Sequence, residues 1–272
     1  GLNEYETIIL EFVEDAPFEE IIPNLYDISK TKNINLKIEK EINCILSHLN
    51  LEDEDKNNLY ELATLIQKYC EKYKSYKYFK DIGKEFGNNY KKTPNIKNLS
   101  KLISIIYIGV VSAMDMHQYL VQCISVALFL FHYLDIYKNK NYYYKGKLAQ
   151  IKTGEGKSLI IAMLSLANAL MGNFVDVITS THYLAERDQL KFKKLYDAFG
   201  VSSSSITKRN PSKLDYNGII LYGTNTDFEF TLLFEGIYKY KKLYTVPLDS
   251  EDGTLIERTY DVAIVDECDN LF

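Results

Sequence analysis

The run Thr153–Ser158, with the sequence TGEGKS, has the residue types that bind phosphate. Glycines let the backbone approach a phosphate closely, and the N–H groups that open a following helix point at the anion. Lys157 can place its charge beside the outer phosphates of a nucleotide, and the hydroxyl of Ser158 is a suitable Mg²⁺ ligand. Ile151 stands where the eight-residue phosphate-loop pattern has its first glycine, so an ordinary glycine turn is the alternative.

The run Val262–Glu267, with the sequence VAIVDE, ends an apolar stretch with two carboxylates. Asp266 at the end of a buried strand could lie beside Mg²⁺, and Glu267 could polarise the water that attacks a phosphate. Such a pair is often only the solvated end of a strand. Because a candidate phosphate loop precedes it by about 110 residues, the two runs together predict a nucleoside triphosphatase.

The elements that would position these residues alternate between strand and helix from about residue 148. Short apolar runs predict strands at Leu148–Ile151, Phe174–Thr179, Gly218–Tyr222 and Tyr260–Val265. The runs between them predict helices at Gly156–Met171 and Tyr183–Phe199. Strands that alternate with helices of this length favour a parallel sheet flanked by helices. Most of the strands are apolar almost throughout, which fits burial on both faces and an α/β fold.

Residues 1–112 predict helices instead. Apolar residues recur there at steps of three and four and line one helix face, in the series Leu59, Leu62, Ile66, Tyr69 and Tyr73. The stretch Gly83–Lys97 contains two glycines, an Asn pair and a proline, and it predicts a loop or a sub-domain boundary. We therefore expect a helical N-terminal region at residues 1–112 and a nucleotide-binding region at residues 113–272.

Two apolar stretches, Leu102–Met114 and Tyr119–Leu134, raise the question of a membrane span. Both are shorter than the roughly 20 residues that cross a bilayer. The second stretch also carries the polar residues Gln122 and His132. Both stretches therefore predict buried helices of a globular core.

The composition narrows the function classes. The 272 residues, 46% of them hydrophobic, can build one large or two modest domains. The net charge of −5 argues against a nucleic-acid partner, which favours a basic surface. The cysteines are widely spaced without a C-x-x-C pair, which predicts isolated thiols in a reducing compartment; they are Cys44, Cys70, Cys123 and Cys268.

Two further runs, Thr179–Asp188 and Tyr222–Asn225, each join a predicted strand to a helix. Taken alone they predict helix caps and turns, and His182 is expected to be a surface or capping residue. The parts Tyr183–Asp188 and Tyr222–Asn225, taken with Ile151–Ser158 and Asp266–Asp269, stand in the order and context of the SecA preprotein-translocase ATPases, and Phe228 fits the same pattern. The sequence resembles this family over about residues 115–272.

The resemblance implies a RecA-like P-loop fold and an ATP-binding site with Mg²⁺. It assigns an adenine pocket to Met116, Tyr119 and Gln122, with Gln122 reading the base edge. It places Lys152, Thr153, Gly154, Glu155, Gly156, Lys157 and Ser158 around the phosphates. Of these, Ser158 would bind the metal together with Asp266.

The same resemblance implies ATP hydrolysis coupled to movement of a polypeptide. Glu267, Lys157 and Asp266 would be the catalytic residues. Arg187 and Asp188 would belong to the segment that couples the nucleotide state to the substrate side. The second motor domain, which supplies further catalytic arginines in this family, is expected to lie outside this sequence, so weak activity is expected of this part alone.

The sequence departs from the family pattern at three places. Lys152 stands where the family usually has arginine, Leu233–Glu235 lacks an arginine, and Cys268 replaces a more usual valine. Alternatives to the translocase are a nucleic-acid helicase-like ATPase and a non-catalytic nucleotide-binding scaffold.

The partners that the resemblance implies are a polypeptide substrate, a membrane translocon and further domains of a longer chain, with nucleic acid disfavoured. It implies a cytoplasmic protein, peripheral at a membrane.

Overall fold

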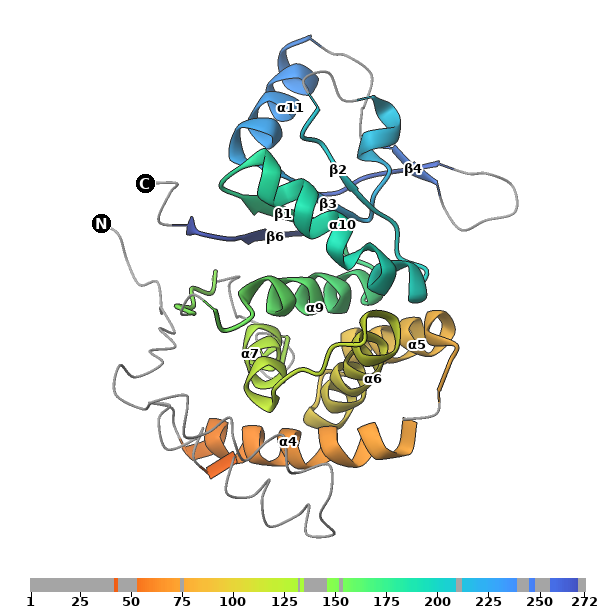
Figure 1. The fold of residues 1–272 in the computed structure, drawn as a ribbon, viewed down its shortest axis with the longest axis vertical. Coiled ribbons are helices and arrows are strands. Elements are labelled where there is room, and N and C mark those ends of the chain that lie inside the picture. The colour runs from red at the N-terminus through yellow and green to blue at the C-terminus, as the bar shows by residue number, and fades with distance from the viewer. Residues whose placement is uncertain are drawn as a thin grey trace.

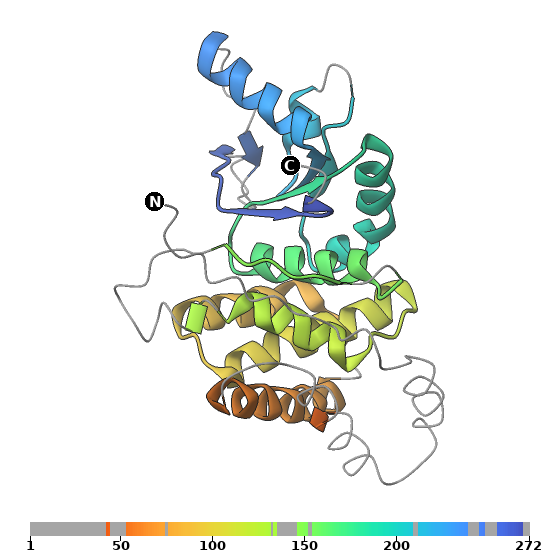
Figure 2. The ribbon, with the colours of Figure 1, turned by 90° about the vertical axis from the view of Figure 1, so that its left-hand side faces the viewer.

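The structure is a computed structural model that describes residues 42–43, 53–73, 76–131, 133–134, 146–151, 154–208, 212–238, 245–247 and 255–268. A block of helices formed by the earlier part of the chain lies against one side of a sheet formed by the later part (Figure 1). The second view shows the same stacking, with α9 between the helical block and the strands (Figure 2).

The four-stranded sheet is parallel and has the order β2-β3-β1-β6. Its strands are β1 (Val175–Thr179), β2 (Ser203–Ser205), β3 (Ile220–Thr224) and β6 (Val262–Val265). The central strand β1 is in register with both neighbours, since Val175 is opposite Ile220 on β3 and Val262 on β6. A separate antiparallel pair joins β4 (Thr245–Pro247) to β5 (Leu255–Glu257). The expected α/β fold with a parallel sheet is confirmed.

Alternate side chains of the strands enter different cores, as the pleat requires. Val177 and Tyr222 are buried in the large core together with α9 (Lys157–Leu170) and α10 (His182–Ala198). Leu221 instead belongs to a small core under α11 (Asn225–Tyr238) and the 3₁₀ turn Lys213–Tyr216. Helices therefore cover both faces of the central strands β1 and β3, which explains why these two strands are mostly apolar.

The helical block consists of α4 (Asp53–Tyr73), α5 (Phe79–Lys92), α6 (Ile96–Met114) and α7 (Leu120–Leu130). The apolar face expected on α4 is buried at Leu59, Leu62, Ile66 and Tyr69 and partly buried at Tyr73. The large core runs without interruption from α4 to β3, so the block and the sheet share one hydrophobic interior.

The prediction of a loop at Gly83–Lys97 is wrong for most of that stretch. Residues up to Lys92 form α5, and the chain turns only at Thr93–Asn95, where the Asn95 side chain accepts a hydrogen bond from the Asn98 N–H at 2.8 Å and caps α6. The glycines serve close packing: a Cβ on Gly87 would collide with the Leu170 carbonyl of α9. Glycine signalled a break in sequence, but here it allows two helices to touch.

The Phe199 ring packs against two other glycines of the helical block, Gly83 and Gly109. This ring is fully buried, and a Cβ on Gly83 of α5 or on Gly109 of α6 would collide with it. The ring also packs on Phe79, with centroids 5.2 Å apart. The end of α10 thus packs against α5 and α6, two consecutive helices that lie much earlier in the chain.

The strand expected at Leu148–Ile151 is not part of the sheet. Its residues alternate between exposed and partly buried: Leu148 is exposed, while Ala149 and Ile151 pack against the large core. The segment therefore has the side-chain pattern of a strand. It follows α7, where the Lys147 ammonium donates to the Leu128 carbonyl at 2.6 Å. A strand requires a hydrogen-bonded neighbour, and none of the described strands pairs with it.

The apolar stretch expected at Leu102–Met114 is longer than predicted. Helix α6 begins at Ile96 and has 19 residues, so the argument from length is wrong. By length and composition α6 is the one helix in the described part that could cross a membrane. Ten of its side chains from Leu99 to Val110 are buried, among α4, α5, α10 and the other helices around it. The expected role as a core helix agrees with this burial.

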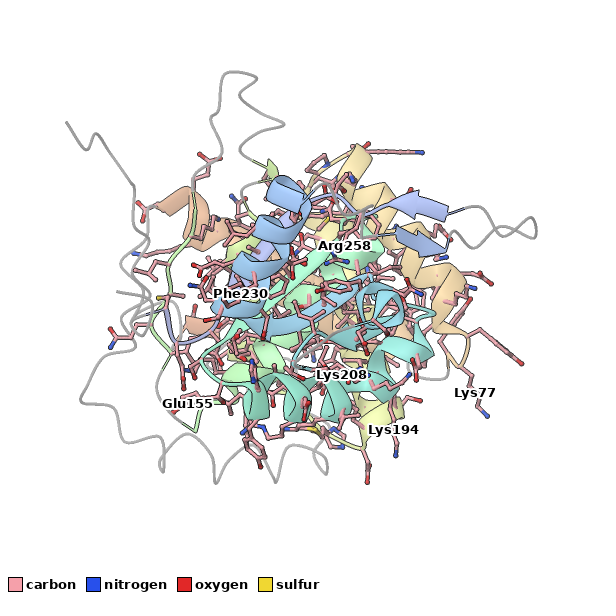
Figure 3. All side chains as sticks on the ribbon, turned by 90° about the horizontal axis from the view of Figure 1, so that it is seen from above. Lys77, Glu155, Lys194, Lys208, Phe230 and Arg258 are labelled. Carbon is pink, nitrogen blue, oxygen red and sulfur yellow. The ribbon has the colours of Figure 1, made fainter. Side chains whose placement is uncertain are left out.

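A buried arginine joins the strands at the edge where they begin. The Arg258 guanidinium contacts the Asp176 carboxylate and donates to the carbonyls of Gly218, Ile219 (3.1 Å) and Val175 (2.9 Å). Figure 3 shows Arg258 well away from Glu155, which lies in the loop that opens α9. Burial raises the pKa of Asp176, and the nearby guanidinium opposes that rise.

We predict that Gly87→Ala destabilises the chain by about 1–3 kcal/mol, because the new methyl group must displace the backbone of α9. The gain in helix propensity, about 1 kcal/mol, offsets only part of this loss. The measurement is chemical denaturation. Gly146→Ala is the matched control, since a Cβ there meets no atom within 4 Å. Equal effects of the two variants would contradict the close helix contact.

Replacing Arg258 with Met should destabilise the chain by about 3–5 kcal/mol at neutral pH, because Asp176 would stay buried without its partner. The loss should shrink as the pH falls, since protonation then neutralises Asp176. The exposed pair of Lys193 and Asp197 provides the control, and Lys193→Met should change stability by about 0–1 kcal/mol. A pH-independent loss would argue that packing alone is responsible.

Candidate functional site

The carboxyl ends of β1, β3 and β6 meet the start of α9 at one edge of the sheet, the edge where parallel α/β sheets bind ligands. The pairing of β6 with β1 ends in a hydrogen bond from the Asp266 N–H to the Ile178 carbonyl at 2.9 Å. Asp266 therefore projects just beyond the sheet. Its Oδ1 lies 3.5 Å from the Lys157 Nζ, so the two predicted motifs do come together.

A glycine turn precedes α9. Gly154 and Gly156 have φ values of 93° and 78°, a backbone region that L side chains rarely adopt. Gly156 is the N-cap of α9, so Lys157 and Ser158 open the helix as predicted. A Cβ on Gly154 would meet no atom within 4 Å, which leaves the turn open on that side. Lys152 and Thr153 lie outside the described residues.

Gln122 connects this turn to α7. Its Nε2 donates to the Glu155 carbonyl at 2.9 Å, and its Oε1 accepts from the Tyr119 N–H at 3.1 Å. The side chain is 5% exposed, and a Cβ on Gly156 would collide with its amide. The residue expected beside the adenine base is thus in direct contact with the glycine turn, which spacing in the sequence could not reveal.

The other two residues expected at the adenine pocket lie just before α7. Tyr119 is the N-cap of that helix and is 37% exposed, while Met116 is partly buried against the large core. Both belong to the connection between α6 and α7. The structure places them on the same segment as Gln122, and their contact with a base stays a prediction.

The Asp266 carboxylate is in an environment that disfavours its charge. Burial raises its pKa, the Lys157 ammonium lowers it, and the neighbouring Glu267 carboxylate raises it again. Its Oδ1 is buried, makes no hydrogen bond within the geometric limits among the described residues, and has the Lys157 ammonium 3.5 Å away as its charge partner. The carboxylate of Asp266 and the hydroxyl of Ser158, which follows Lys157 at the start of α9, are oxygen ligands of the kind that Mg²⁺ prefers.

Glu267 leaves the strand in the left-handed region, with a φ of 55°. Its Oε2 accepts a hydrogen bond from the Ser180 hydroxyl at 2.6 Å. Ser180 lies between β1 and α10, so this contact joins the ends of two neighbouring strands. Ser180 was expected only as part of a cap or turn.

The loop after β1 also holds the start of α10. The Thr181 hydroxyl caps the helix by accepting from the Leu184 N–H at 3.2 Å, as a strand-to-helix junction predicts. Arg187 binds its neighbour Asp188, with Nη2 and Oδ1 2.8 Å apart. The bond to Asp188 raises the pKa of Arg187, and the Asp266 charge adds a smaller contribution.

The loop after β3 contains a reciprocal cap. The Asp227 carboxylate accepts from the N–H (2.9 Å) and the hydroxyl (2.7 Å) of Thr224. Its other oxygen lies 3.1 Å from the His182 Nε2, which connects the starts of α10 and α11. The threonine followed by an acidic residue three positions later was a readable capping signal. The contact with His182 was not, because it depends on how β1 and β3 pair.

A groove of about 560 Å³ lies elsewhere, between α4 and α6. Lysines and tyrosines line it, among them Lys68, Lys101 and Tyr69. None of the predicted site residues borders it. The candidate site is therefore defined by the strand-end loops and not by this groove.

The fold and these groups define a parallel α/β domain with a glycine turn and a lysine at a helix start, the class that binds nucleotides at its strand ends. A family model for the SecA DEAD-like domain matches residues 45–272. The chain belongs to this family, which is one of ATPases. The matched part begins well before residue 115 and includes much of the helical block.

Three similar proteins are each named protein translocase subunit SecA. That of Anaplasma phagocytophilum is 37% identical over 131 residues, which are 47% of this chain and 14% of that protein. That of Porphyromonas gingivalis strain W83 is 36% identical over 132 residues, 47% of this chain and 11% of that protein. That of Desulfovibrio desulfuricans is 37% identical over 131 residues, 47% of this chain and 14% of that protein. The match therefore spans 11–14% of these relatives.

We expect Asp266→Asn to stabilise the nucleotide-free chain near neutral pH, by about 0.5–2 kcal/mol as for other strained site residues. The pKa of Asp266 is raised in the folded state, so its contribution is most favourable below its unfolded pKa of about 3.9 and is lost as the pH rises through the folded value. Asn avoids this loss. Thermal unfolding at several pH values would measure the gain.

The advantage of Asn over Asp should disappear below about pH 4, where both side chains are neutral. Asp197→Asn is the control, because Asp197 pairs with Lys193 on the exposed side of α10. A stabilisation by Asp266→Asn that persisted unchanged at low pH would contradict an origin in the buried charge.

Proposed function

We propose that the chain is the ATP-binding part of a SecA-like motor that couples ATP hydrolysis to polypeptide translocation. The observation that carries the proposal is the contact between the Lys157 ammonium at the start of α9 and the Asp266 carboxylate at the end of β6. A phosphate-binding lysine and a metal-binding carboxylate must lie at the same edge of the sheet to hold Mg-ATP, and this contact brings them there.

The residues present fit this ligand. Gly154–Ser158 would surround the phosphates, with Lys152 and Thr153 beside them. Ser158 and Asp266 would hold Mg²⁺, and Glu267 would orient the attacking water. When bound, Mg²⁺ neutralises phosphate charge and so favours phosphoryl transfer.

The adenine base would contact Met116, Tyr119 and Gln122. The Gln122 amide already makes one donated and one accepted hydrogen bond, so one amide N–H and one lone pair of Oε1 are left to recognise a base edge. The assignment predicts that base recognition and the shape of the glycine turn depend on each other, because Gln122 contacts the turn directly.

The wider activity follows from the family. The substrate would be a polypeptide, with a membrane translocon and further domains of a longer chain as partners and a cytoplasmic location that extends to the membrane surface. Residues 1–112 would form a helical region and residues 113–272 the first part of the motor domain. Arg187 and Asp188, which lie in the second turn of α10, would pass the nucleotide state onward.

The alternatives are less well supported. A helicase-like ATPase and a non-catalytic scaffold share the motor core, but the family model and the similar proteins all carry the name SecA. The contact of Lys157 with Asp266 also argues against a site that has lost its chemistry.

Calorimetry should detect Mg-ATP binding to the chain, and Lys157→Ala should weaken it by about 10-fold to 150-fold. The estimate corresponds to the loss of a hydrogen bond to a charged group, about 1.5–3 kcal/mol. Lys194→Ala, on the exposed face of α10 and away from Glu155 (Figure 3), should bind like the unchanged chain. Equal binding by both variants would refute the assigned phosphate site.

A further inference from the structure

The loop between β1 and α10 provides a second contact to the acidic end of β6. Ile178 on β1 is opposite Val265 on β6, so the residues that follow these two strands are also neighbours. The Ser180 hydroxyl donates to the Glu267 Oε2 at 2.6 Å, the distance expected of a charge-assisted bond between a hydroxyl and a carboxylate, and such bonds are stronger than neutral ones. This bond joins two residues that lie just outside the ladder.

Glu267 needs such a contact because its backbone does not hold it in a regular element. Its φ of 55° places it in the left-handed region, which is unfavourable for an L side chain by about 1–2 kcal/mol. The ladder ends one residue earlier, at the bond from the Asp266 N–H to the Ile178 carbonyl. Glu267, whose carboxylate would orient a reacting group, is therefore the first residue after the last hydrogen bond of the sheet.

Ser180 is itself held in place from both sides. The buried Thr179 hydroxyl donates to the Thr181 carbonyl at 3.1 Å and closes a tight turn around Ser180. The Thr181 hydroxyl in turn caps α10. The donor for Glu267 thus belongs to a rigid turn between a buried strand and a 17-residue helix, which is the kind of support that keeps a functional side chain in one orientation.

We propose that Ser180 is a positioning residue for Glu267: its hydroxyl holds Oε2 and so fixes the orientation of the carboxylate toward the attacking water. The proposal rests on the role given to Glu267 in the proposed function. It goes beyond that role because Ser180 would act only through Glu267, without contact to the nucleotide or the metal.

A positioning role predicts a specific kinetic pattern. Ser180→Ala should lower kcat for ATP by about 10-fold and leave KM within about 2-fold, because ground-state binding does not use the Ser180 hydroxyl. Ser180→Thr keeps a hydroxyl and should restore most of kcat. Ser205→Ala on β2 is the matched control and should change neither value. A rise in KM equal to the fall in kcat/KM would overturn the proposal.

A double-mutant cycle tests whether the effect passes through Glu267. Glu267→Gln should reduce turnover strongly, and Ser180→Ala in that background should add less than about 2-fold. Independent effects that multiply would mean that Ser180 acts elsewhere, and would overturn the proposal.

A measurement on the nucleotide-free chain separates this proposal from the proposed function. The ¹³C resonance of the Glu267 carboxyl, assigned by its loss in Glu267→Gln, should move in Ser180→Ala and not in Ser205→Ala. An unmoved resonance would overturn the positioning role even if Mg-ATP binds. A moved resonance in a chain that fails to bind Mg-ATP would count against the proposed function and leave the contact established.

Discussion

The pairing of β6 with β1 is the constraint on which the candidate site depends. The last hydrogen bond of this pairing runs from the Asp266 N–H to the Ile178 carbonyl. It fixes the position of Asp266, whose carboxylate lies 3.5 Å from the Lys157 ammonium. Lys157 and Asp266 are far apart in sequence, and the parallel pairing of the strands brings them into contact. Because parallel strands end at the same edge, one pairing also determines the neighbours of Glu267 and of the loop after β1.

The two edges of the sheet use buried charge differently. At the edge where strands begin, the Arg258 guanidinium donates to carbonyls and contacts the Asp176 carboxylate, which links β1 to the start of β3, although its Nε is buried without an acceptor among the described residues. At the other edge, the Asp266 carboxylate has a raised pKa and the Lys157 ammonium as its charge partner at 3.5 Å. The first ion pair joins two strands where they begin, while the second lies at the edge where parallel α/β sheets bind ligands.

The helical block contributes to the site by positioning α9 and α7. Gly83 and Gly87 let α5 approach α9 and the end of α10, and Gly109 of α6 receives the Phe199 ring from the other side. Close packing of this kind leaves little freedom for α9 to shift. The glycine turn that opens α9 is then held from α7 through the amide of Gln122. The block is therefore part of the same rigid unit as the strand-end loops.

The sequence by itself determined the local features: the strands near Val177 and Tyr222 and the helices between them, the glycine turn before Lys157, and the acidic pair after β6. These depend on neighbours a few residues away, so periodicity and residue type suffice to predict them. Gly87 was misread as a break and Leu148–Ile151 as a paired strand, because close helix approach and ladder partners are long-range properties. Tertiary structure alone decided that Ser180 meets Glu267, that Gln122 supports the glycine turn and that His182 meets Asp227, since each contact exists only after distant strands and helices have packed.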